Sequence, residues 1–564
     1  MSKKLDFFSH PIILVTASFL VVLAAISTVS CTGSGSSTLD KAIGAIDGEE
    51  LAAHTEILGS DEFEGRFPGT EGEEKTVRFL EDAFRKIGAQ PGNGNSYFQD
   101  VPMVEITASP DTTLTVSGRD QKRSFAYGDE FVALTLRNQD RVSSDSEIVY
   151  VGYGIVAPEY NWNDYEGVDV AGKTVVMLVN DPGFATEDPD LFKGRAMTYY
   201  GRWTYKYEEA ARQGASGVLL IHETEPASYG WEVVRNGNTG PQLSLETADG
   251  NASRCAVESW ISLETASAIF QMAGLDFETM KEAAQQPGFR ASPLHLKASV
   301  SLQNTIRKIM SRNVVALIPG GKRADEYIIY TAHWDHFGRD TNLEGDQIFN
   351  GALDNATGTA GLLELAQAYL ALEQPPGRSI LLLAVTAEEQ GLLGSAYYAS
   401  FPIYPLTKTA AVINMDSLNI FGRMKDVRLV GYGQSELDDY VKAAAQEQGR
   451  VVLPNPTPEK GSFFRSDHFP FAKQGVPALY ASSGVDHREK GEEWGRARKE
   501  EYARRNYHKP SDEFDPSWDF SGAVEDIQLI FKVGYRLAME TKFPQWNEGS
   551  EFKAKRDADL ALIN

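Results

Sequence analysis

Cysteine is nearly absent from this sequence: Cys31 and Cys255 are the only two among 564 residues. A disulfide framework is therefore excluded as the main source of stability. Basic residues are also outnumbered, with 54 Lys and Arg against 79 Asp and Glu and a formal net charge of -25. This balance argues against a nucleic-acid partner, because phosphate binding needs a basic surface. No Gly-x-Ser-x-Gly motif occurs, so a serine-hydrolase elbow has no support either.

Long apolar runs are equally scarce, and the one that stands out lies at the N-terminus, from about Pro11 to Val29 after Lys3 and Lys4. It has the length of a signal or of a membrane span. The stretch Ser27-Thr28-Val29-Ser30-Cys31 resembles a bacterial lipoprotein signal, with Thr28 where such signals usually carry Leu. A lipoprotein signal, a cleaved signal and an uncleaved anchor all remain open for residues 1–31. Each predicts an exported body that is periplasmic, secreted or tethered to the cell envelope.

The rest of the sequence divides by composition, and its hydrophobic content of 42% favours a globular body. A Gly/Ser linker comes first, and two helices separated by Gly65-Arg66-Phe67-Pro68-Gly69 follow it. A region rich in short β-type runs then interrupts the main domain. The predicted boundaries are a linker at 32–38, a first part of the main domain at 39–105, an inserted region at 106–300, the larger part of the main domain at 301–545 and a C-terminal tail at 546–564.

Strands and helices alternate in the larger part of the main domain. The pattern predicts strands at 327–332, 380–385, 411–415 and 478–481, with helices at 359–372, 436–448 and 522–540. Such alternation indicates an α/β fold in which a mostly parallel sheet is flanked by helices. Ligands of such folds collect at the carboxyl ends of the strands.

His, Asp and Glu residues follow these strands or the adjacent turns. They are His333 and Asp335, Asp354, Glu388 and Glu389, Asp416 and, in a distant polar loop, His508. Gathered without metal, these carboxylates would repel one another, and burial would raise their pKa values. Imidazole and carboxylate together suit zinc, and five such ligands suffice for two zinc ions when one carboxylate bridges.

In this order, the residues resemble a known family. The series His333-x-Asp335, Asp354-Asn355, Glu388-Glu389, Asn414-Met415-Asp416 and Tyr507-His508 is similar to the co-catalytic zinc aminopeptidases of peptidase family M28. That group includes bacterial leucyl aminopeptidases and glutamate carboxypeptidases of the prostate membrane antigen type. The resemblance covers about 40–105 and 312–545, and it implies the zinc-exopeptidase fold and two Zn²⁺ per chain.

The resemblance also implies a role for each residue. Asp354 would bridge the metals, His333 and Asp416 would complete one site, and Glu389 and His508 the other. Asp335 would accept a hydrogen bond from the far nitrogen of His333 and so fix its tautomer. The Asp354–Asn355 peptide bond is expected to be cis.

The implied reaction is hydrolysis of peptide substrates by a hydroxide held between the two zinc ions. Glu388 would be the general base and would then protonate the leaving amine. Tyr507 would either help to stabilise the oxyanion or serve only as a packing residue. Asp467 and His468 either line the substrate pocket or belong to a loop network that holds the fold. His336 is interpreted as a rim residue rather than a ligand, and the charged run 486–505 as a solvated helix or a lid.

The inserted region has a resemblance of its own. Val151-Gly152-Tyr153-Gly154-Ile155, Asp164-Tyr165, Val170-Ala171-Gly172-Lys173 and Gly214-Ala215-Ser216-Gly217 look like parts of a protease-associated domain. Such β-rich modules interrupt many peptidases of this group, so a role in shaping access to the site or in binding partners is expected.

The leading hypothesis is a di-zinc aminopeptidase that removes N-terminal residues. A related carboxypeptidase, or a single-zinc enzyme like glutaminyl cyclase, remains as an alternative. A receptor-like binding protein without catalysis is the alternative of another class. The sequence leaves side-chain specificity and oligomeric state open.

Overall fold

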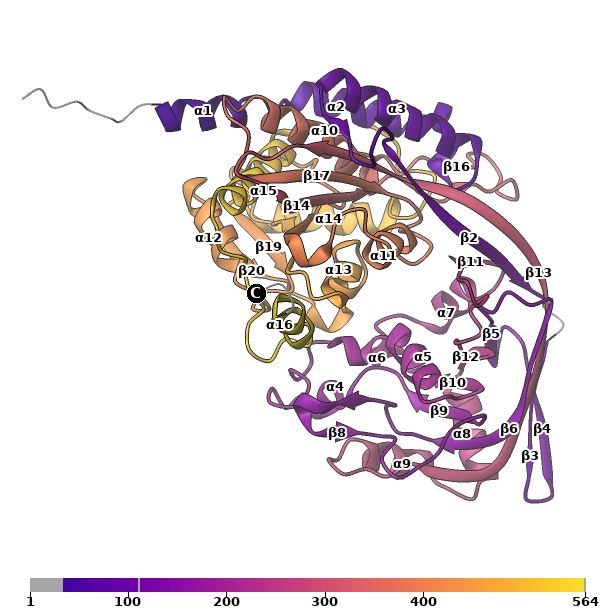
Figure 1. The fold of residues 1–564 in the computed structure, drawn as a ribbon. Coiled ribbons are helices and arrows are strands. Elements are labelled where there is room, and N and C mark those ends of the chain that lie inside the picture. Colours follow the sequence, from indigo (N-terminus) through magenta and orange to yellow (C-terminus); the bar gives the residue numbers. More distant parts are fainter. Residues whose placement is uncertain (1–33, 110–111, 562–564) are drawn as a thin grey trace, which may run out of the picture.

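The computed structural model describes residues 34–109 and 112–561, so the predicted signal segment lies outside it. Figure 1 shows two bodies, one above the other, joined along one side by the long strands β2 (Phe98–Ala108) and β13 (Ser292–Ile318). These two strands pair antiparallel. One end of β13 belongs to the sheet of the upper body and the other end to the sheet of the lower body. The strand therefore crosses the predicted boundary at residue 300 without a break. We call the lower body, residues 106–300, the insert.

The sheet of the upper body is mostly parallel at its centre, as the strand–helix alternation predicts. Strands β17, β14, β18 and β21 run parallel in that order, and β13 and β19 lie antiparallel on either side. The bounds are β14 Arg323–His333, β17 Arg378–Val385, β18 Thr409–Asn414, β19 Asp426–Val430, β20 Val451–Pro454 and β21 Ala478–Ser483.

Helices cover both faces of this sheet. Alternate residues of β14 separate the two faces: Ile328 packs in the same core as helices α10 (Thr357–Leu370) and α15 (Ser521–Met539), whereas Ile329 packs in the core that contains α11 (Leu393–Ser400) and α13 (His468–Lys473). The near-continuous apolar runs of the central strands reflect this burial on both sides. Helix α12 (Leu437–Glu447) packs against α15 at the edge.

The insert has its own sheet and core. Strands β6, β9, β10 and β12 run parallel, and β5 pairs antiparallel with β12. The bounds are β3 Thr113–Gly118, β4 Gln121–Ala126, β5 Phe131–Leu134, β6 Arg141–Tyr150, β9 Thr174–Leu178, β10 Gly217–Ile221, β11 Pro241–Leu245 and β12 Val257–Ile261, with helices α5 Trp203–Arg212, α7 Trp231–Gly237, α8 Leu263–Met272 and α9 Phe277–Ala284.

The N-terminal segment differs from its prediction. Helix α1 (Ser34–Ile43) begins within the segment interpreted as a linker, because Leu39, Ala42 and Ile43 pack against the core of the upper body and stabilise a helix that composition alone disfavours. The single helix that the sequence predicts before Gly65 is two helices. The side chain of Asp47 accepts hydrogen bonds from backbone N–H groups of the next turn and so starts α2 (Gly48–Leu58) as a separate element. Helix α3 (Glu71–Ile87) follows as predicted.

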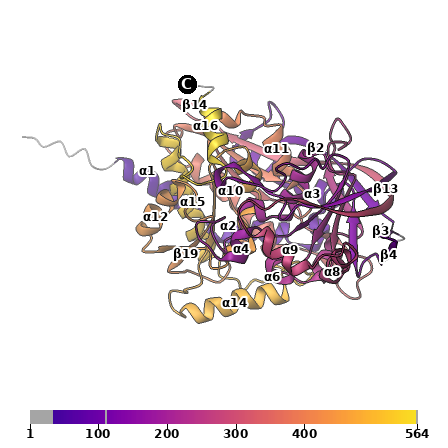
Figure 2. The same ribbon diagram turned by 90° about the horizontal axis from the view of Figure 1, so that it is seen from below.

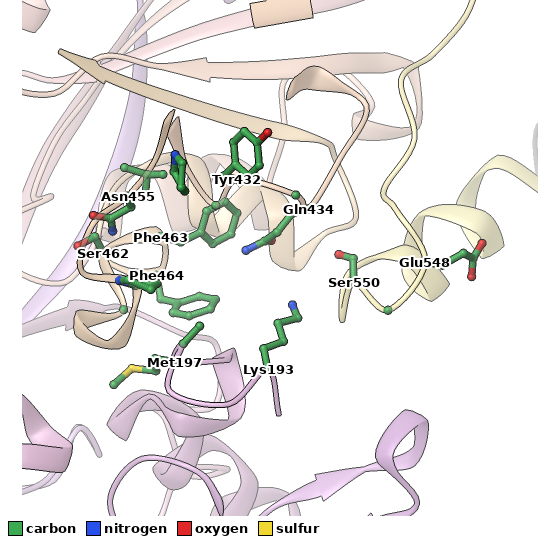
Figure 3. A pocket seen from close by; sticks show the side chains of 18 residues that line it. Lys193, Met197, Tyr432, Gln434, Asn455, Ser462, Phe463, Phe464, Glu548 and Ser550 are labelled. Carbon is green, nitrogen blue, oxygen red and sulfur yellow. The ribbon is translucent and has the colours of Figure 1, made fainter. Parts of the chain in front are cut away.

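The C-terminal segment is packed against both bodies. Trp546, Phe552 and Arg556 are buried, and helix α16 (Lys553–Ala561) is the last described element. A cavity of about 310 Å³ lies where this segment, the upper body and the insert meet. Figure 3 shows its lining side chains, with Lys193 and Met197 on the insert side. Within the described residues, no helix has the length and apolarity to cross a bilayer, and the apolar run near the N-terminus falls outside them.

A buried carboxyl group in α10 makes the stability of the upper body depend on pH. Glu364 is fully buried, one of its oxygens accepts a hydrogen bond from the N–H of Asp47, and burial raises its pKa to about 8. The folded state therefore holds this proton more tightly than the unfolded state, so the contribution of Glu364 to stability falls as pH rises from about 4.5 to 8.

The substitution Glu364→Gln should remove this dependence and keep the acceptor for Asp47. We expect the Tm difference between variant and wild type to be near zero at pH 5 and to grow in favour of the variant toward pH 8, as measured by calorimetry. A difference that stays constant across this range would contradict the assignment.

Candidate metal centre

The predicted ligands lie together at the carboxyl ends of the parallel strands. His333 ends β14, Glu389 follows β17 and Asp416 follows β18. Asp354 lies in the turn before α10, and His508 lies in the loop after α14 (Glu492–Arg505). Residues from five segments, spread over 176 positions, thus meet at one place, as the crossover connections of a parallel sheet require.

Asp354 lies between the two histidines. Its Oδ1 is 3.3 Å from His333 Nε2, and its Oδ2 is 3.3 Å from His508 Nε2. His333 Nε2 is also 3.7 Å from Asp416 Oδ1, and His508 Nε2 is 3.3 Å from Glu389 Oε2. One oxygen of Asp354 therefore faces each histidine, which is the geometry of a bridging carboxylate.

The donor atoms fit a divalent cation. His508 Nε2 and Glu389 Oε1 are buried and make no contact with hydrogen-bond geometry among the described residues, although polar atoms lie close to both. Two sets of donor atoms are close enough to hold an ion, namely those of His333, Asp354 and Glu389 and those of His333, Glu388 and Asp416. Imidazole nitrogens with carboxylate oxygens are the ligand set that zinc accepts.

The electrostatics of the centre show a conflict that a cation would resolve. Burial lowers the pKa of the His333 imidazole, but Glu388, Asp354 and Asp416 outweigh burial and raise it well above its usual value. Burial, with repulsion from Asp354, raises the pKa of Glu389 well above its usual range, and burial does the same for Glu388. Several carboxylates compete for little positive charge in a poorly hydrated place, so a bound cation would stabilise their ionised forms.

The role expected for Asp335 needs a correction. His333 Nδ1 donates to the backbone carbonyl of Asp335 at 3.2 Å, and the Asp335 carboxylate lies 3.8 Å away from this nitrogen. The carboxylate instead accepts the N–H groups of Glu388, at 3.0 Å, and Glu389, at 3.4 Å. The carbonyl thus sets the tautomer of His333, and the side chain holds the turn after β17.

Two further residues hold the centre in place, although no spacing in the sequence marks them. Arg66 is buried in the turn between α2 and α3, and its guanidinium donates to the carbonyls of Trp334 and Gly351, each at 2.8 Å. Asp512 accepts the N–H groups of Leu353, at 3.2 Å, and Asp354, at 3.1 Å. A single arginine in a turn and a single aspartate in a polar loop belong to no sequence pattern. Only the folded protein therefore shows that they hold the segments of the centre.

Asn355 and Ser466 fix the remaining segments. The Asp354–Asn355 peptide bond is cis, as expected. The Asn355 amide donates to the carbonyl of Met415 at 3.0 Å, which ties the turn before α10 to the end of β18. Ser466 Oγ donates to Asp416 Oδ2 at 2.8 Å and accepts from the Asn414 amide at 2.7 Å.

Asp467 and His468 do not line the cavity, contrary to the substrate-pocket interpretation. Both are fully buried, and Asp467 accepts a hydrogen bond from Ser395 at 2.6 Å. His468 packs among aromatic rings, including Phe463 and Tyr480, and burial lowers its pKa to about 3. The alternative, a network that holds the loop, fits this environment. The short helix α13 begins here and turns both side chains toward the core.

His336 and Tyr507 differ in exposure. His336 is not on the rim but fully buried, and its Nδ1 lies 2.7 Å from Glu389 Oε1. Gly351 leaves room for the ring, because a Cβ at position 351 would lie 2.5 Å from the imidazole. Tyr507 is 40% exposed and stacks on His508, with ring centroids 3.7 Å apart. The charged run before it forms α14, which buries only Gly495 and lies along one edge of the molecule (Figure 2).

The centre opens into a cavity of about 870 Å³ between the upper body and the insert. Asp354, Glu388 and Tyr507 line it on one side, and Trp203 and Trp260 of the insert line it on the other. A molecule bound at the metal centre would therefore contact both bodies.

Comparison with known proteins identifies the part of the sequence that holds the centre. Residues 313–531 match the model described as peptidase family M28. A probable glutamate carboxypeptidase of Arabidopsis thaliana is 26% identical over 300 residues, which cover 49% of this chain and 38% of the relative. A probable zinc metalloprotease of Leptosphaeria maculans is 31% identical over 128 residues, which cover 21% of this chain and 29% of the relative. The chain thus spans less than half of the length of either relative.

The fold is shared more widely than the sequence. An aminopeptidase from Aneurinibacillus sp. strain AM-1 matches with a TM-score of 0.51 and 20% identity, covering 90% of this chain and 97% of that protein. This similarity confirms the predicted fold class, an α/β protein whose mostly parallel sheet is flanked by helices. All five predicted ligands and Glu388 lie within the segment that matches the family model. Residues 313–531 of this protein therefore form a domain of peptidase family M28.

Proposed function

We propose that this protein is a zinc-dependent exopeptidase, and specifically an aminopeptidase that removes residues from the N-termini of peptides. The observation that carries the proposal is the position of Asp354, with one carboxylate oxygen 3.3 Å from each of two histidines at the mouth of a large cavity. His333 and Asp416 would hold one zinc ion, Glu389 and His508 a second, and Asp354 would contact both.

Bound zinc would supply Lewis-acid chemistry and lower the pKa of a water molecule toward neutrality. Glu388 lines the cavity beside these ligands, and its backbone N–H is anchored to Asp335 at 3.0 Å. Its carboxylate would accept the proton of the attacking water and return it to the leaving amine. Tyr507 stacks on His508 and lines the same cavity, and its hydroxyl would donate to the oxygen on which charge develops.

The insert would shape access to this centre. Its resemblance to a protease-associated domain, and the side chains it contributes to the opposite wall of the cavity, support this role. We also propose that the body is exported and acts in the periplasm, at the cell envelope or outside the cell, with the apolar N-terminal run as its signal or tether.

The proposal is tested by the zinc content of the purified protein together with hydrolysis of aminoacyl reporter substrates. We expect about two zinc ions per protein molecule and cleavage of substrates that have a free N-terminus. Cleavage only of N-blocked peptides would indicate a carboxypeptidase, and a single zinc would favour the cyclase-like alternative. Protein that binds no zinc and cleaves nothing would belong among receptor-like binding proteins.

A further inference from the structure

The cavity of about 310 Å³ in which the C-terminal segment, the upper body and the insert meet is separate from the one at the metal centre. We call it the junction cavity. Val430, which ends β19, and Pro454, which ends β20, both line it, and these two strands run parallel. The junction cavity therefore lies at the carboxyl ends of parallel strands, where ligands of α/β folds collect. Its volume is at the lower end of the range for small-molecule sites.

Gln434 lines the junction cavity with an amide that lacks a partner. Its backbone is paired, since the N–H donates to the carbonyl of Gly431 at 3.2 Å and the carbonyl accepts from the N–H of Asn547 at 2.8 Å. The side-chain Oε1 is buried, and no described residue donates a hydrogen bond to it. A buried acceptor without a partner costs free energy. A ligand that donates an N–H group to Gln434 would remove this cost.

Lys193 and Glu548 are the only charged side chains among the described residues that line the junction cavity. The Lys193 ammonium donates to Glu551 at 2.9 Å, which uses one of its three N–H groups. The side chain of Glu548 is 93% exposed, and in Figure 3 it lies at the edge of the cavity, away from the aromatic rings. Lys193 therefore has donors left for an oxygen acceptor of a ligand.

An apolar wall completes the junction cavity. Phe463, Phe464 and Met197 are buried, and the two phenylalanine rings pack edge to face with centroids 5.4 Å apart. The backbone of Gly431 has a φ of +80°, and a Cβ at this position would lie 2.3 Å from the ring of Phe463. Glycine at position 431 thus allows the ring to approach. An apolar group of a ligand would be removed from water against this wall.

These three features match the parts of one small molecule. An α-amino acid carries an ammonium group that donates, a carboxylate that accepts and a side chain on the carbon between them. Figure 3 shows the side chains of Gln434 and Lys193 extending into the same space, one from the upper body and one from the insert, beside the phenylalanine rings. An amino acid is also neutral overall, which suits a cavity with one lysine and one glutamate.

We propose that the junction cavity is a binding site for a free α-amino acid with an apolar side chain. The ammonium group donates to Gln434 Oε1, the carboxylate accepts from Lys193, and the side chain packs against the phenylalanine rings. This inference is drawn from the lining of the cavity and goes beyond the proposed function. Phe464 lines both the junction cavity and the cavity at the metal centre, so a bound amino acid lies against a wall that the two cavities share.

The test titrates the full-length protein, loaded with zinc, with L-leucine, L-leucinamide and glycine in a calorimeter. L-Leucinamide lacks the carboxylate and glycine lacks the apolar side chain. We expect each of them to bind the junction cavity about tenfold or more weakly than L-leucine, because each lacks one of the three contacts. Equal affinity for L-leucine and L-leucinamide, or for L-leucine and glycine, would overturn the assignment of the ligand.

Two variants locate the binding. Gln434→Met should weaken the binding of L-leucine about tenfold or more, because a hydrogen bond to a charged group is lost. It should leave the Tm of the ligand-free protein unchanged or raised, since an unpaired buried acceptor is removed, whereas a purely structural glutamine would lower Tm when replaced. Ala196→Leu, which fills the cavity from the insert side, should weaken binding without touching the amide. Gln446→Met, at an exposed glutamine of α12, is the matched control. Unchanged affinity in either cavity variant would overturn the site.

Asp354→Asn separates the junction cavity from the metal centre. An amino acid would also bind at zinc if the protein is an aminopeptidase, and this variant should lose that second mode of binding. Binding of L-leucine that persists in Asp354→Asn and disappears on adding Gln434→Met would support the junction cavity even in a protein that cleaves no peptide. Loss of all L-leucine binding in Asp354→Asn would place the only site at the metal centre and refute the inference.

Discussion

Replacing Glu388 with Gln is expected to lower kcat for N-terminal hydrolysis by about 10²–10⁴-fold, the range associated with loss of general acid–base catalysis. Glu388 lines the cavity beside the proposed ligands, whereas its neighbour Glu389 lies 3.3 Å from His508 Nε2 and is itself a proposed ligand. The amide of Gln keeps the size of the side chain but accepts no proton. Steady-state kinetics on an aminoacyl reporter, with zinc content measured on the same preparation, checks this expectation.

Glu389→Gln is the informative companion because the two residues are adjacent in sequence and differ only in their proposed role. We expect Glu388→Gln to keep its zinc and Glu389→Gln to lose part of it. If Glu388→Gln retained kcat within about threefold of wild type, a range far smaller than general-base catalysis supplies, another group would have to move the proton. Loss of zinc from both variants would instead mean that Glu388 is a ligand.

The second large effect is expected at Asp354. In Asp354→Asn the carboxylate that faces both histidines becomes an amide, which is a poor ligand for zinc. We expect zinc content to fall from about two per protein molecule to well below one, with hydrolysis at background level. Elemental analysis after dialysis against a weak chelator measures the content.

Thermal unfolding provides a second readout for the same variant. Zinc that binds only the folded state should raise Tm of the wild type, and Asp354→Asn should not respond to added zinc. Asp346→Asn, an exposed acidic residue on the hairpin loop that precedes the ligand turn, serves as control and should behave as wild type. A zinc-dependent Tm that survives in Asp354→Asn would show that the main metal site lies elsewhere.

The sequence predicted those parts of the structure in which a hydrophobic pattern is followed directly by residues with metal-binding side chains. Strands that are buried on both faces read as continuous apolar runs, and each proposed ligand follows such a run or an adjacent turn, so both the parallel sheet and the gathering of His333, Asp354 and Asp416 could be predicted. The family match over 313–531 includes the same residues.

Residues that act through backbone contacts could not be found in this way. Arg66 binds carbonyl groups more than 260 positions away, and Asp335 uses its carbonyl for His333 and its carboxylate for a different turn. The burial of Asp467 and His468 depends on how α13 is packed, which no motif specifies. The cavity between the metal centre and the insert likewise depends on how the two bodies are placed.

That placement follows from strand β13, whose 27 residues pair with β17 in the sheet of the upper body and with β6 in the sheet of the insert. Eleven residue pairs with β2 stiffen the middle of β13. The two bodies are therefore not free to open and close about a flexible hinge at this strand. The cavity between the two bodies, in which a substrate would lie, should therefore keep a nearly constant width. Excising the insert would cut strand β13, which also belongs to the sheet of the upper body, so we expect residues 313–531 not to fold stably without the insert.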